Sequence, residues 1–197
     1  MAYVALLDAS VLHPWVLADL LLRLAERGLF RPSWSAEILD ELVRSLERRR
    51  PEGAEAFRRR RAEMEAYFPE ASTADSRPFM PPVPGDVHVD DRHVVAAALA
   101  AHADVIVTTN TRHFPPDSLA GLAIAVQTPD EFLIHQWWLR PELVAAEIVD
   151  MAAATTKPHL NPDEIVTSLS RTVPVFAGMV AASDEFAVAK RQPRQGA

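Results

Sequence analysis

The chain has 197 residues, of which 49% are hydrophobic, so it can bury a core of ordinary size and is not extensively disordered. It has no cysteine, which excludes disulfide bonds and thiolate metal sites. Its formal net charge of −7 argues against a protein that coats nucleic acid by bulk electrostatics. We find no signal-peptide pattern and no apolar run of the roughly 18 to 20 residues that a membrane span needs, so we expect a soluble, cytoplasmic protein.

The first predicted elements are a strand and a helix. Residues 4–7 form a short apolar run, which predicts a buried strand. Ser10 is placed to cap a helix whose apolar residues recur at helical spacing and whose end is expected near Gly28. The chain thus begins with the strand-then-helix order that is typical of α/β proteins.

The next region is predicted to be helical and then irregular. Residues 31–35 favour a turn, and Ser35 is placed to cap a second amphipathic helix that ends near Pro51. Residues 53–68 have a helical but highly charged pattern. Residues 69–87 contain five prolines, so we expect mostly loop there, and a long loop in a compact domain is often functional.

Helices and strands then alternate again. The acidic pair at residues 90–91 begins an alanine-rich helix that runs to about Ala103. Residues 104–108 predict a buried parallel strand and residues 122–126 one more strand. A helix over residues 129–133 follows, with a proline at its start.

This alternation over about the first 135 residues predicts a three-layer α/β/α fold with a central parallel sheet. After Pro141 the pattern changes to three short amphipathic helices, expected at residues 142–156, 162–171 and 173–183. We therefore predict an α/β domain of residues 1–138, a helical extension of residues 139–185 and a flexible tail of residues 186–197.

Acidic residues mark three of the predicted elements. Asp8 directly follows the first strand, Glu41 lies on the second helix, and Asp91 stands at the start of the alanine-rich helix. An apolar strand that ends at an acid places its charge at the carboxyl edge of the sheet, where open α/β folds keep their ligand crevice. Carboxylates at the ends of buried elements usually need a cation, so we expect the chemistry at this edge.

Several short motifs, taken together in their order and spacing, resemble the PIN-domain family, and in particular the VapC-type toxin ribonucleases of toxin–antitoxin pairs. The resemblance covers about residues 3–135, so the first predicted domain would be a PIN-like nuclease domain and the C-terminal helices an extension of the minimal fold. It is carried by residues 7–12, 34–35, 38–42, 90–94 with Ala96 and Ala98, and 106–115.

The resemblance implies a metal-dependent endoribonuclease in which three or four acidic side chains hold one or two Mg²⁺ or Mn²⁺ ions. Asp8, Glu41 and Asp91 stand on its acidic positions and are the implied catalytic and metal-binding residues. Hydrolysis of a phosphodiester must stabilise charge on the phosphoryl oxygens and activate a water, and hard divalent cations held by carboxylates supply both.

Each acid also has a structural explanation. Asp8 could cap the helix that follows it, although Ser10 is better placed for that role. Asp40 and Glu41 both flank the apolar stripe of their helix, and a solvated helix face would explain either; the family pattern selects Glu41.

Asp90 and Asp91 stand together at a helix start, where unpaired backbone N–H groups and the helix dipole favour an acid. The alanine pattern of the family selects Asp91 for the metal and leaves Asp90 as the cap. With His88 and His93 the same region resembles a transition-metal motif. We do not favour that interpretation, because alternate positions around a helix start do not converge on one point and imidazole suits Mg²⁺ poorly.

The chain departs from the family pattern at the fourth acidic position, where Asn110 and His113 replace aspartates. These side chains can position water or substrate but hold a second hard cation less well, so a one-metal resting site, or a second ion bound only with substrate, stays open. We expect Ser10, Thr108, Asn110 and His113 to support the site. Thr108 and Asn110 are equally explained as turn residues at a strand end, and nothing in the spacing selects Asp117 as a substitute acid.

One segment of this acidic chain is basic. Residues 44–61 contain eight arginines and three glutamates, a local charge of +5. Because arginine binds phosphate oxygens bidentately, the segment could guide an RNA backbone toward the metal; a solvated helical hairpin or a docking surface for an acidic partner explains it equally well. The RNA-binding candidates are Arg44, Arg48, Arg58, Arg59, Arg60 and Arg61.

The favoured hypothesis is an endoribonuclease that hydrolyses RNA as the toxin of a type II toxin–antitoxin system. The alternative is a catalytically weak PIN-fold module that chiefly binds RNA or protein, since the fourth acid is missing. A haloacid-dehalogenase-type phosphatase also begins with an acid after a strand, but it needs a second aspartate where Ser10 stands. The resemblance further implies a cognate antitoxin protein that masks the site, and a homodimer.

Overall fold

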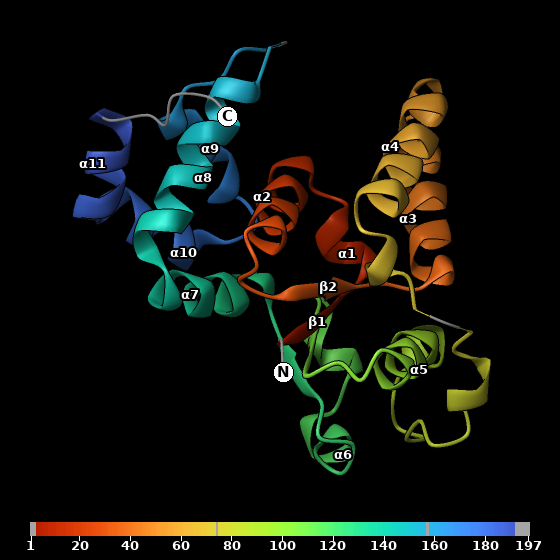
Figure 1. Ribbon diagram of the computed structural model, residues 1–197. Helices are drawn as coiled ribbons and strands as arrows, with labels where there is room; N and C mark the ends of the chain where they lie inside the picture. The colour runs from red at the N-terminus through yellow and green to blue at the C-terminus, as the bar shows by residue number, and fades with distance from the viewer. Residues whose placement is uncertain (1–2, 74, 157, 192–197) are drawn as a thin grey trace. The chain divides into compact units, whose positions relative to one another are not determined.

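The computed structural model describes residues 3–73, 75–156 and 158–191. The chain divides into two compact units, one made of residues 1–13 and 30–128 and the other of residues 14–29 and 129–197. The first unit contains the sheet, and the helices labelled α2 and α7 to α11 in Figure 1 belong to the second.

The sheet has four parallel strands in the order β2-β1-β3-β4, which confirms the predicted parallel sheet of an α/β protein. Its strands are β1 (Val4–Leu7), β2 (Arg31–Ser33), β3 (Val105–Val107) and β4 (Ala125–Gln127). Every residue of β1 and β3 is buried, as their uninterrupted apolar sequences predict. Leu7 pairs with Val107, so the residues that follow these two strands emerge side by side at the carboxyl edge.

Two strands differ from the prediction. Residues 31–33 were expected in a turn but form β2, an edge strand, where a proline such as Pro32 is tolerated because one side of the strand needs no hydrogen-bond donor. The last strand begins at Ala125 rather than at Leu122, because the chain turns just before it: Ala123 has a φ of 56° and its N–H donates to the carbonyl of Ala120.

The first predicted helix is in fact two helices, α1 (Ala9–Leu12) and α2 (Trp15–Glu26). The break falls at Pro14, which has no N–H with which to continue the hydrogen bonding of α1. Ser10 therefore lies inside α1 and is not its N-cap; Asp8 holds that position, without a capping hydrogen bond from its side chain. The division into units follows this break, since α2 groups with the C-terminal helices.

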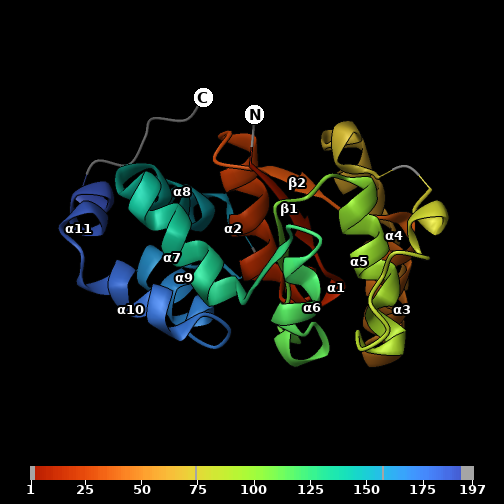
Figure 2. The ribbon, with the colours of Figure 1, turned by 90° about the horizontal axis from the view of Figure 1, so that it is seen from below.

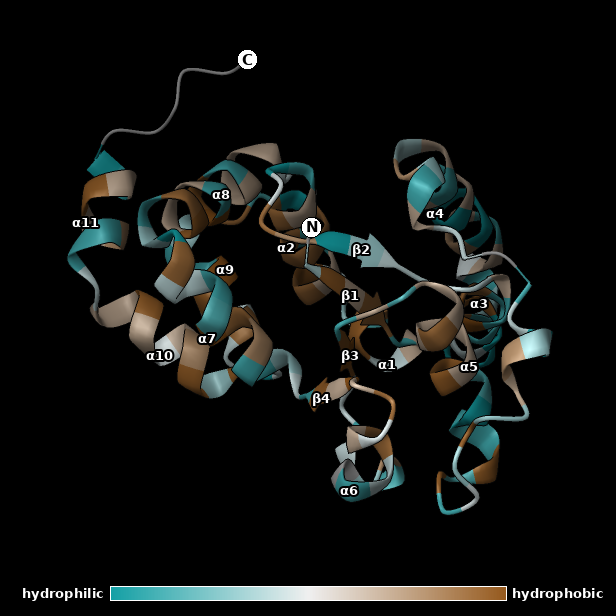
Figure 3. Cartoon of the chain, turned by 60° about the horizontal axis from the view of Figure 1, so that its bottom comes forward, coloured by the Kyte–Doolittle hydropathy of each residue, from teal (hydrophilic) through white to brown (hydrophobic). Residues whose placement is uncertain are grey.

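The remaining helices of the first unit begin near the residues that the sequence indicates, except the short helix of residues 116–120, which was not predicted. Ser35 caps α3 as predicted, because its hydroxyl accepts a hydrogen bond of 3.2 Å from the N–H of Ile38. Helices α3 and α4 form the expected charged hairpin, and Figures 1 and 2 show them side by side. In Figure 3 the ribbon of α4 is largely hydrophilic, whereas the strands β1 and β3 are hydrophobic. These helices are α3 (Ala36–Arg49), α4 (Ala54–Tyr67), α5 (Arg92–Ala100) and α6 (Pro116–Ala120).

The second unit is helical in its described residues. Four of its helices begin with a proline, a residue that suits the first helical turn. Helices α8 and α9 both pack on α2, and the buried Glu147 of α8 accepts a hydrogen bond of 2.6 Å from Nε of Arg27, just beyond α2. The helices are α7 (Pro129–Leu139), α8 (Pro141–Ala154), α9 (Pro162–Leu169), α10 (Pro174–Ala182) and α11 (Asp184–Arg191).

The C-terminal part of the chain differs from the predicted segments in two respects. The boundary predicted between residues 138 and 139 falls inside α7, which belongs entirely to the helical unit. Residues 186–191 were expected in the tail but belong to α11, whereas residues 192–197 lie outside the described part of the chain. None of the helices among the described residues is long and apolar enough to cross a membrane.

Candidate active site

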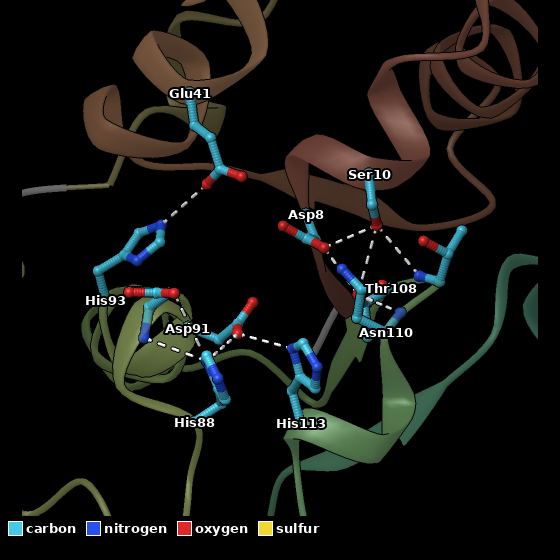
Figure 4. Close-up of polar contacts among 11 residues, drawn as sticks. Asp8, Ser10, Glu41, His88, Asp91, His93, Thr108, Asn110 and His113 are labelled. Atoms are coloured by element: carbon cyan, nitrogen blue, oxygen red, sulfur yellow. Dashed lines mark hydrogen bonds and ion pairs between the residues drawn. The ribbon is translucent and has the colours of Figure 1, made fainter. Parts of the chain in front are cut away.

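Three carboxylates from distant parts of the sequence face one another in the first unit. Asp8 follows β1, Glu41 lies on α3, and Asp91 is the N-cap residue of α5. Figure 4 shows their side chains pointing toward a common space. The three acids that the sequence predicts for the site are therefore brought together by the fold.

Asp8 is held in place by two hydroxyl groups. Its Oδ2 accepts hydrogen bonds of 2.7 Å from Ser10 Oγ and of 2.7 Å from Thr108 Oγ1. Its other carboxylate oxygen points into the common space in Figure 4. Asp8 is 3% exposed, and burial raises the pKa of its carboxyl group. The two hydroxyls lower that pKa, and the charges of Glu41 and Asp91 raise it. A cation in the common space would offset the effects of burial and of the neighbouring negative charges, so the chemistry of these donors suits a hard cation.

The two hydroxyls are themselves fixed by the backbone after β3. Ser10 Oγ accepts a hydrogen bond of 3.0 Å from the N–H of Thr109, and Thr108 Oγ1 accepts one of 3.0 Å from the N–H of Asn110. Ser10 and Thr108 therefore lie in the site as supporting residues, and Asn110 contributes its backbone. Asp117, by contrast, is exposed on α6.

Glu41 faces a histidine. Nε2 of His93 lies 3.5 Å from its Oε2, an ion-pair distance rather than that of an ordinary hydrogen bond. The His93 imidazole, with smaller contributions from Arg44 and Arg48, holds the pKa of Glu41 below its usual value despite partial burial. Burial lowers the pKa of His93, but the carboxylates of Glu41 and Glu37 outweigh it and the pKa is raised.

Asp91 has two imidazoles on the opposite side of the common space. Its Oδ2 lies 2.9 Å from Nδ1 of His113 and 3.3 Å from Nδ1 of His88. The two rings are stacked, with centroids 4.5 Å apart and an angle of 19° between their planes. The residue at the N-cap of α5 is Asp91 and not, as predicted, Asp90, whose side chain is 85% exposed.

The histidine arrangement only partly matches the sequence interpretation. His93 turns to Glu41 and Asp90 points to solvent, but His88 and Asp91 do converge, with Nδ1 of His88 3.3 Å from Oδ2 of Asp91, so the argument against convergence was wrong for these two residues. The sequence reasoning missed, however, that His113 joins His88 on Asp91. The sole sequence signal was that His113 stands where the resemblance implies an acid. His113 lies 22 positions after Asp91, so the sequence does not predict their contact.

The arginines of the basic segment fall into two groups. Those of α4 are engaged: Arg58 pairs with Glu47 at 2.7 Å, Arg59 with Glu63 at 3.6 Å, and Arg61 with Asp40. Arg60 donates a hydrogen bond of 3.0 Å to the carbonyl of Leu12. Arg58 and Arg61 thus join α4 to α3, whereas the pair of Arg59 lies within α4 and Arg60 reaches α1.

Arg44 and Arg48 differ from them. Both are exposed on α3, three and seven residues after Glu41, which places the three side chains along one face of the helix. Within the described part of the chain neither forms an ion pair, and the charges of both act on Glu41. A strip of unpaired positive charge therefore runs along α3 up to the acidic site.

Comparisons with known proteins agree with the fold. Residues 4–112 match a family model described as the PIN domain, and residues 129–182 match one described as the VapC50 C-terminal domain. The chain is 43% identical over 90 residues to a Mycobacterium tuberculosis protein named "Putative ribonuclease VapC50". The aligned part covers 46% of this chain and 53% of that relative, so the chain spans about half the relative's length. No solved structure matches.

Proposed function

Because the chain belongs to the PIN-domain family, we propose that it is a metal-dependent endoribonuclease, the toxin of a type II toxin–antitoxin pair, that hydrolyses phosphodiester bonds of RNA. The observation that carries this proposal is the convergence of the carboxylates of Asp8, Glu41 and Asp91 on one space. The ribonuclease name of the mycobacterial relative and the match to the VapC50 C-terminal domain support it.

In this proposal the three carboxylates hold Mg²⁺ or Mn²⁺, hard cations for which carboxylate oxygens are the preferred ligands. When bound, such an ion stabilises charge on the phosphoryl group and activates a water. The buried Asp8 is the central ligand: Ser10 and Thr108 fix one of its oxygens and leave the other facing the site. His93 keeps Glu41 ionised, so that it is ready to bind a cation.

We assign the path of the RNA backbone to the strip formed by Arg44 and Arg48, which is narrower than the set of six arginines that the sequence suggested. Both side chains are exposed, lie on the face of Glu41 and carry no paired acid within the described part of the chain. Guanidinium groups in this position would bind phosphate oxygens next to the metal-binding acids. Arg58, Arg59 and Arg61 are already paired with carboxylates.

The proposed partners are those of a toxin. An antitoxin would inhibit the enzyme by covering the carboxylates or the exposed arginines of α3, and a homodimer and a cytoplasmic location would accompany this function. The match of residues 129–182 to the VapC50 C-terminal domain supports the proposal that this chain is a toxin of that type.

Cleavage of a labelled RNA, measured with Mn²⁺, with Mg²⁺ and with a chelator, tests the proposal. We expect cleavage by the wild-type chain only with metal, and none by an Asp8→Asn variant, which keeps the size of the side chain but not its charge. Asp117→Asn, a change to an exposed acid of the same unit, is the matched control and should leave cleavage unaltered. RNA binding without cleavage by the wild-type chain would instead favour a catalytically weak binding module.

A further inference from the structure

A group of three metal-binding side chains lies beside the carboxylate site. The Nδ1 atoms of His88 and His113 and a carboxylate oxygen of Asp91 all lie within 4.8 Å of one another. His88 precedes α5, Asp91 is its N-cap and His113 follows β3, so the fold brings together segments that are distant along the chain. The N–H of His88 donates a hydrogen bond of 3.1 Å to the carbonyl of His113, which ties the two segments together.

The spacing of these atoms suits a small cation. In a tetrahedral zinc site with bonds of about 2.0 to 2.2 Å, neighbouring ligand atoms lie roughly 3.4 Å apart. In this structure Asp91 Oδ2 lies 2.9 Å from Nδ1 of His113 and 3.3 Å from Nδ1 of His88. The three ligand atoms therefore lie at separations near those around a bound ion, and the stacked rings, with 19° between their planes, would rotate so that both Nδ1 lone pairs point at it.

The hydrogen bonding of His88 is a second, independent indication. Its Nδ1 accepts a weak hydrogen bond of 3.4 Å from the N–H of Asp90, so this nitrogen carries no proton, and a cation would replace that N–H at its single lone pair. The same atom lies 3.3 Å from the Asp91 carboxylate, which also donates electron pairs. Two such groups repel each other unless a cation lies between them.

We propose that His88, Asp91 and His113 bind a divalent first-row transition ion, such as Zn²⁺, in a site that shares Asp91 with the carboxylate site. Two imidazoles and one carboxylate favour such ions over Mg²⁺, which prefers oxygen ligands. Three protein ligands leave a fourth position open for water or substrate. In Figure 4 the second oxygen of Asp91 points toward Asp8, so one carboxylate faces both sites.

Binding at this triad does not depend on the nuclease activity; only its influence on that activity rests on the proposed function. A transition ion on Asp91 Oδ2 would lie next to the cation held by the three carboxylates. The triad also contains His113, the residue that stands where the resemblance implies a fourth acid. Here the fourth position would contribute an imidazole to a transition ion instead of a carboxylate to a second Mg²⁺.

Calorimetric titration of the metal-free full chain with ZnCl₂, in millimolar MgCl₂ that occupies the carboxylate site, tests this proposal. We expect one Zn²⁺ per chain, and a loss of affinity of about tenfold or more in each of His88→Gln and His113→Gln. Even the loss of a residue that only hydrogen-bonds to a metal ligand lowers metal affinity by this factor. Circular dichroism melting curves will show whether the variants are folded.

Three further variants separate the alternatives. His102→Asn removes an exposed histidine of the same unit, at a φ of 51° that asparagine tolerates, and should keep full Zn²⁺ affinity. His93→Gln should also bind Zn²⁺, since His93 contacts Glu41 instead of Asp91. Asp8→Asn should bind Zn²⁺ while it loses cleavage, so a failure of the nuclease hypothesis and a failure of the triad hypothesis give different results.

X-ray absorption at the zinc edge of the wild-type chain provides a readout that needs no variant. We expect the scattering pattern of two imidazole ligands. The proposal is overturned by any of three results: zinc bound without imidazole, equal Zn²⁺ affinity in wild type and His113→Gln, or no Zn²⁺ binding in the presence of Mg²⁺. Protonated histidines would then explain the contacts with Asp91.

Discussion

Thr108 Oγ1 donates a hydrogen bond of 2.7 Å to Oδ2 of Asp8, and this bond joins the residues that follow two neighbouring strands. The pairing of Leu7 with Val107 brings the two residues to the same edge of the sheet. The hydroxyl orients the carboxylate and favours its charged form, because a hydrogen bond to a carboxylate lowers its pKa. The parallel sheet thus prepares the central acid of the proposed metal site.

Replacement of Thr108 by valine should impair both the orientation and the ionisation of Asp8. Without this hydrogen bond the pKa of Asp8 rises further, so the acidic limb of the pH–rate profile should move to higher pH. We expect stability to fall by about 2 kcal/mol, as for the loss of a hydrogen bond to a charged group. Thr109→Val, at the neighbouring exposed threonine, is the control. An unchanged acidic limb in Thr108→Val would show that this bond does not tune Asp8.

Asp8→Asn should not destabilise the protein when metal is absent. Burial raises the folded-state pKa of Asp8 above its unfolded value near 3.8, so ionisation of Asp8 opposes folding. This loss of stability is fully present above the folded-state pKa and disappears as the pH falls below 3.8. Removal of the charge should therefore leave the melting temperature at pH 7 equal or higher. Added Mn²⁺ should raise the melting temperature of the wild type by mass action but not that of the variant.

Thermal melting with and without a chelator measures both effects. Asp117→Asn should behave as the wild type in each condition. A metal-induced shift of equal size in Asp8→Asn would exclude Asp8 as a ligand.

His93→Gln should change how stability depends on pH in the metal-free chain. The folded-state pKa of His93 is raised above 6.5 by Glu41 and Glu37, so its contribution is fully present below pH 6.5 and is lost as the pH rises through the folded pKa. The difference in melting temperature between wild type and variant should therefore be largest near pH 5.5 and shrink above pH 7. A constant difference in melting temperature between wild type and His93→Gln would contradict the ion pair.

Arg44→Ala and Arg48→Ala should each weaken RNA binding and reduce its dependence on salt. Loss of one phosphate contact should lower the slope of log affinity against log salt by about one, and cleavage at saturating RNA should change less than binding. Arg59→Ala is the matched control, since Arg59 is equally exposed in the neighbouring helix but is paired with Glu63. If Arg59→Ala and Arg44→Ala reduced the slope equally, the RNA path would not follow α3.

The sequence by itself determined much of the local structure. Uninterrupted apolar residues predicted β1 and β3, because strands buried on both faces need no polar side chains. Ser35 predicted the start of α3 through its capping hydroxyl. The position of Asp8 directly after an apolar strand indicated the edge of the sheet at which the acids now face one another.

The sequence predicted less where two local signals compete. Residues 31–33 resemble a turn, and only pairing with β1 makes them an edge strand. The apolar spacing beyond Ser10 suggested one long helix, but the missing N–H of Pro14 divides it, and α2 then groups with the C-terminal helices. The residues after Pro141 form the expected helices. Helix α11 then stands where a flexible tail was expected.

Only the tertiary structure decided which charged side chains pair. Most of these pairs join residues that are far apart in the sequence, or residues that also have charged near neighbours as possible partners. Examples are the contact of His113 with Asp91, the ion pair of His93 with Glu41 and the pairs of the α4 arginines. Apolar periodicity and capping act within a few residues, so they can be read from the chain. Electrostatic partners are set by where packing places each charge and by how far burial removes it from water, and these depend on the complete fold.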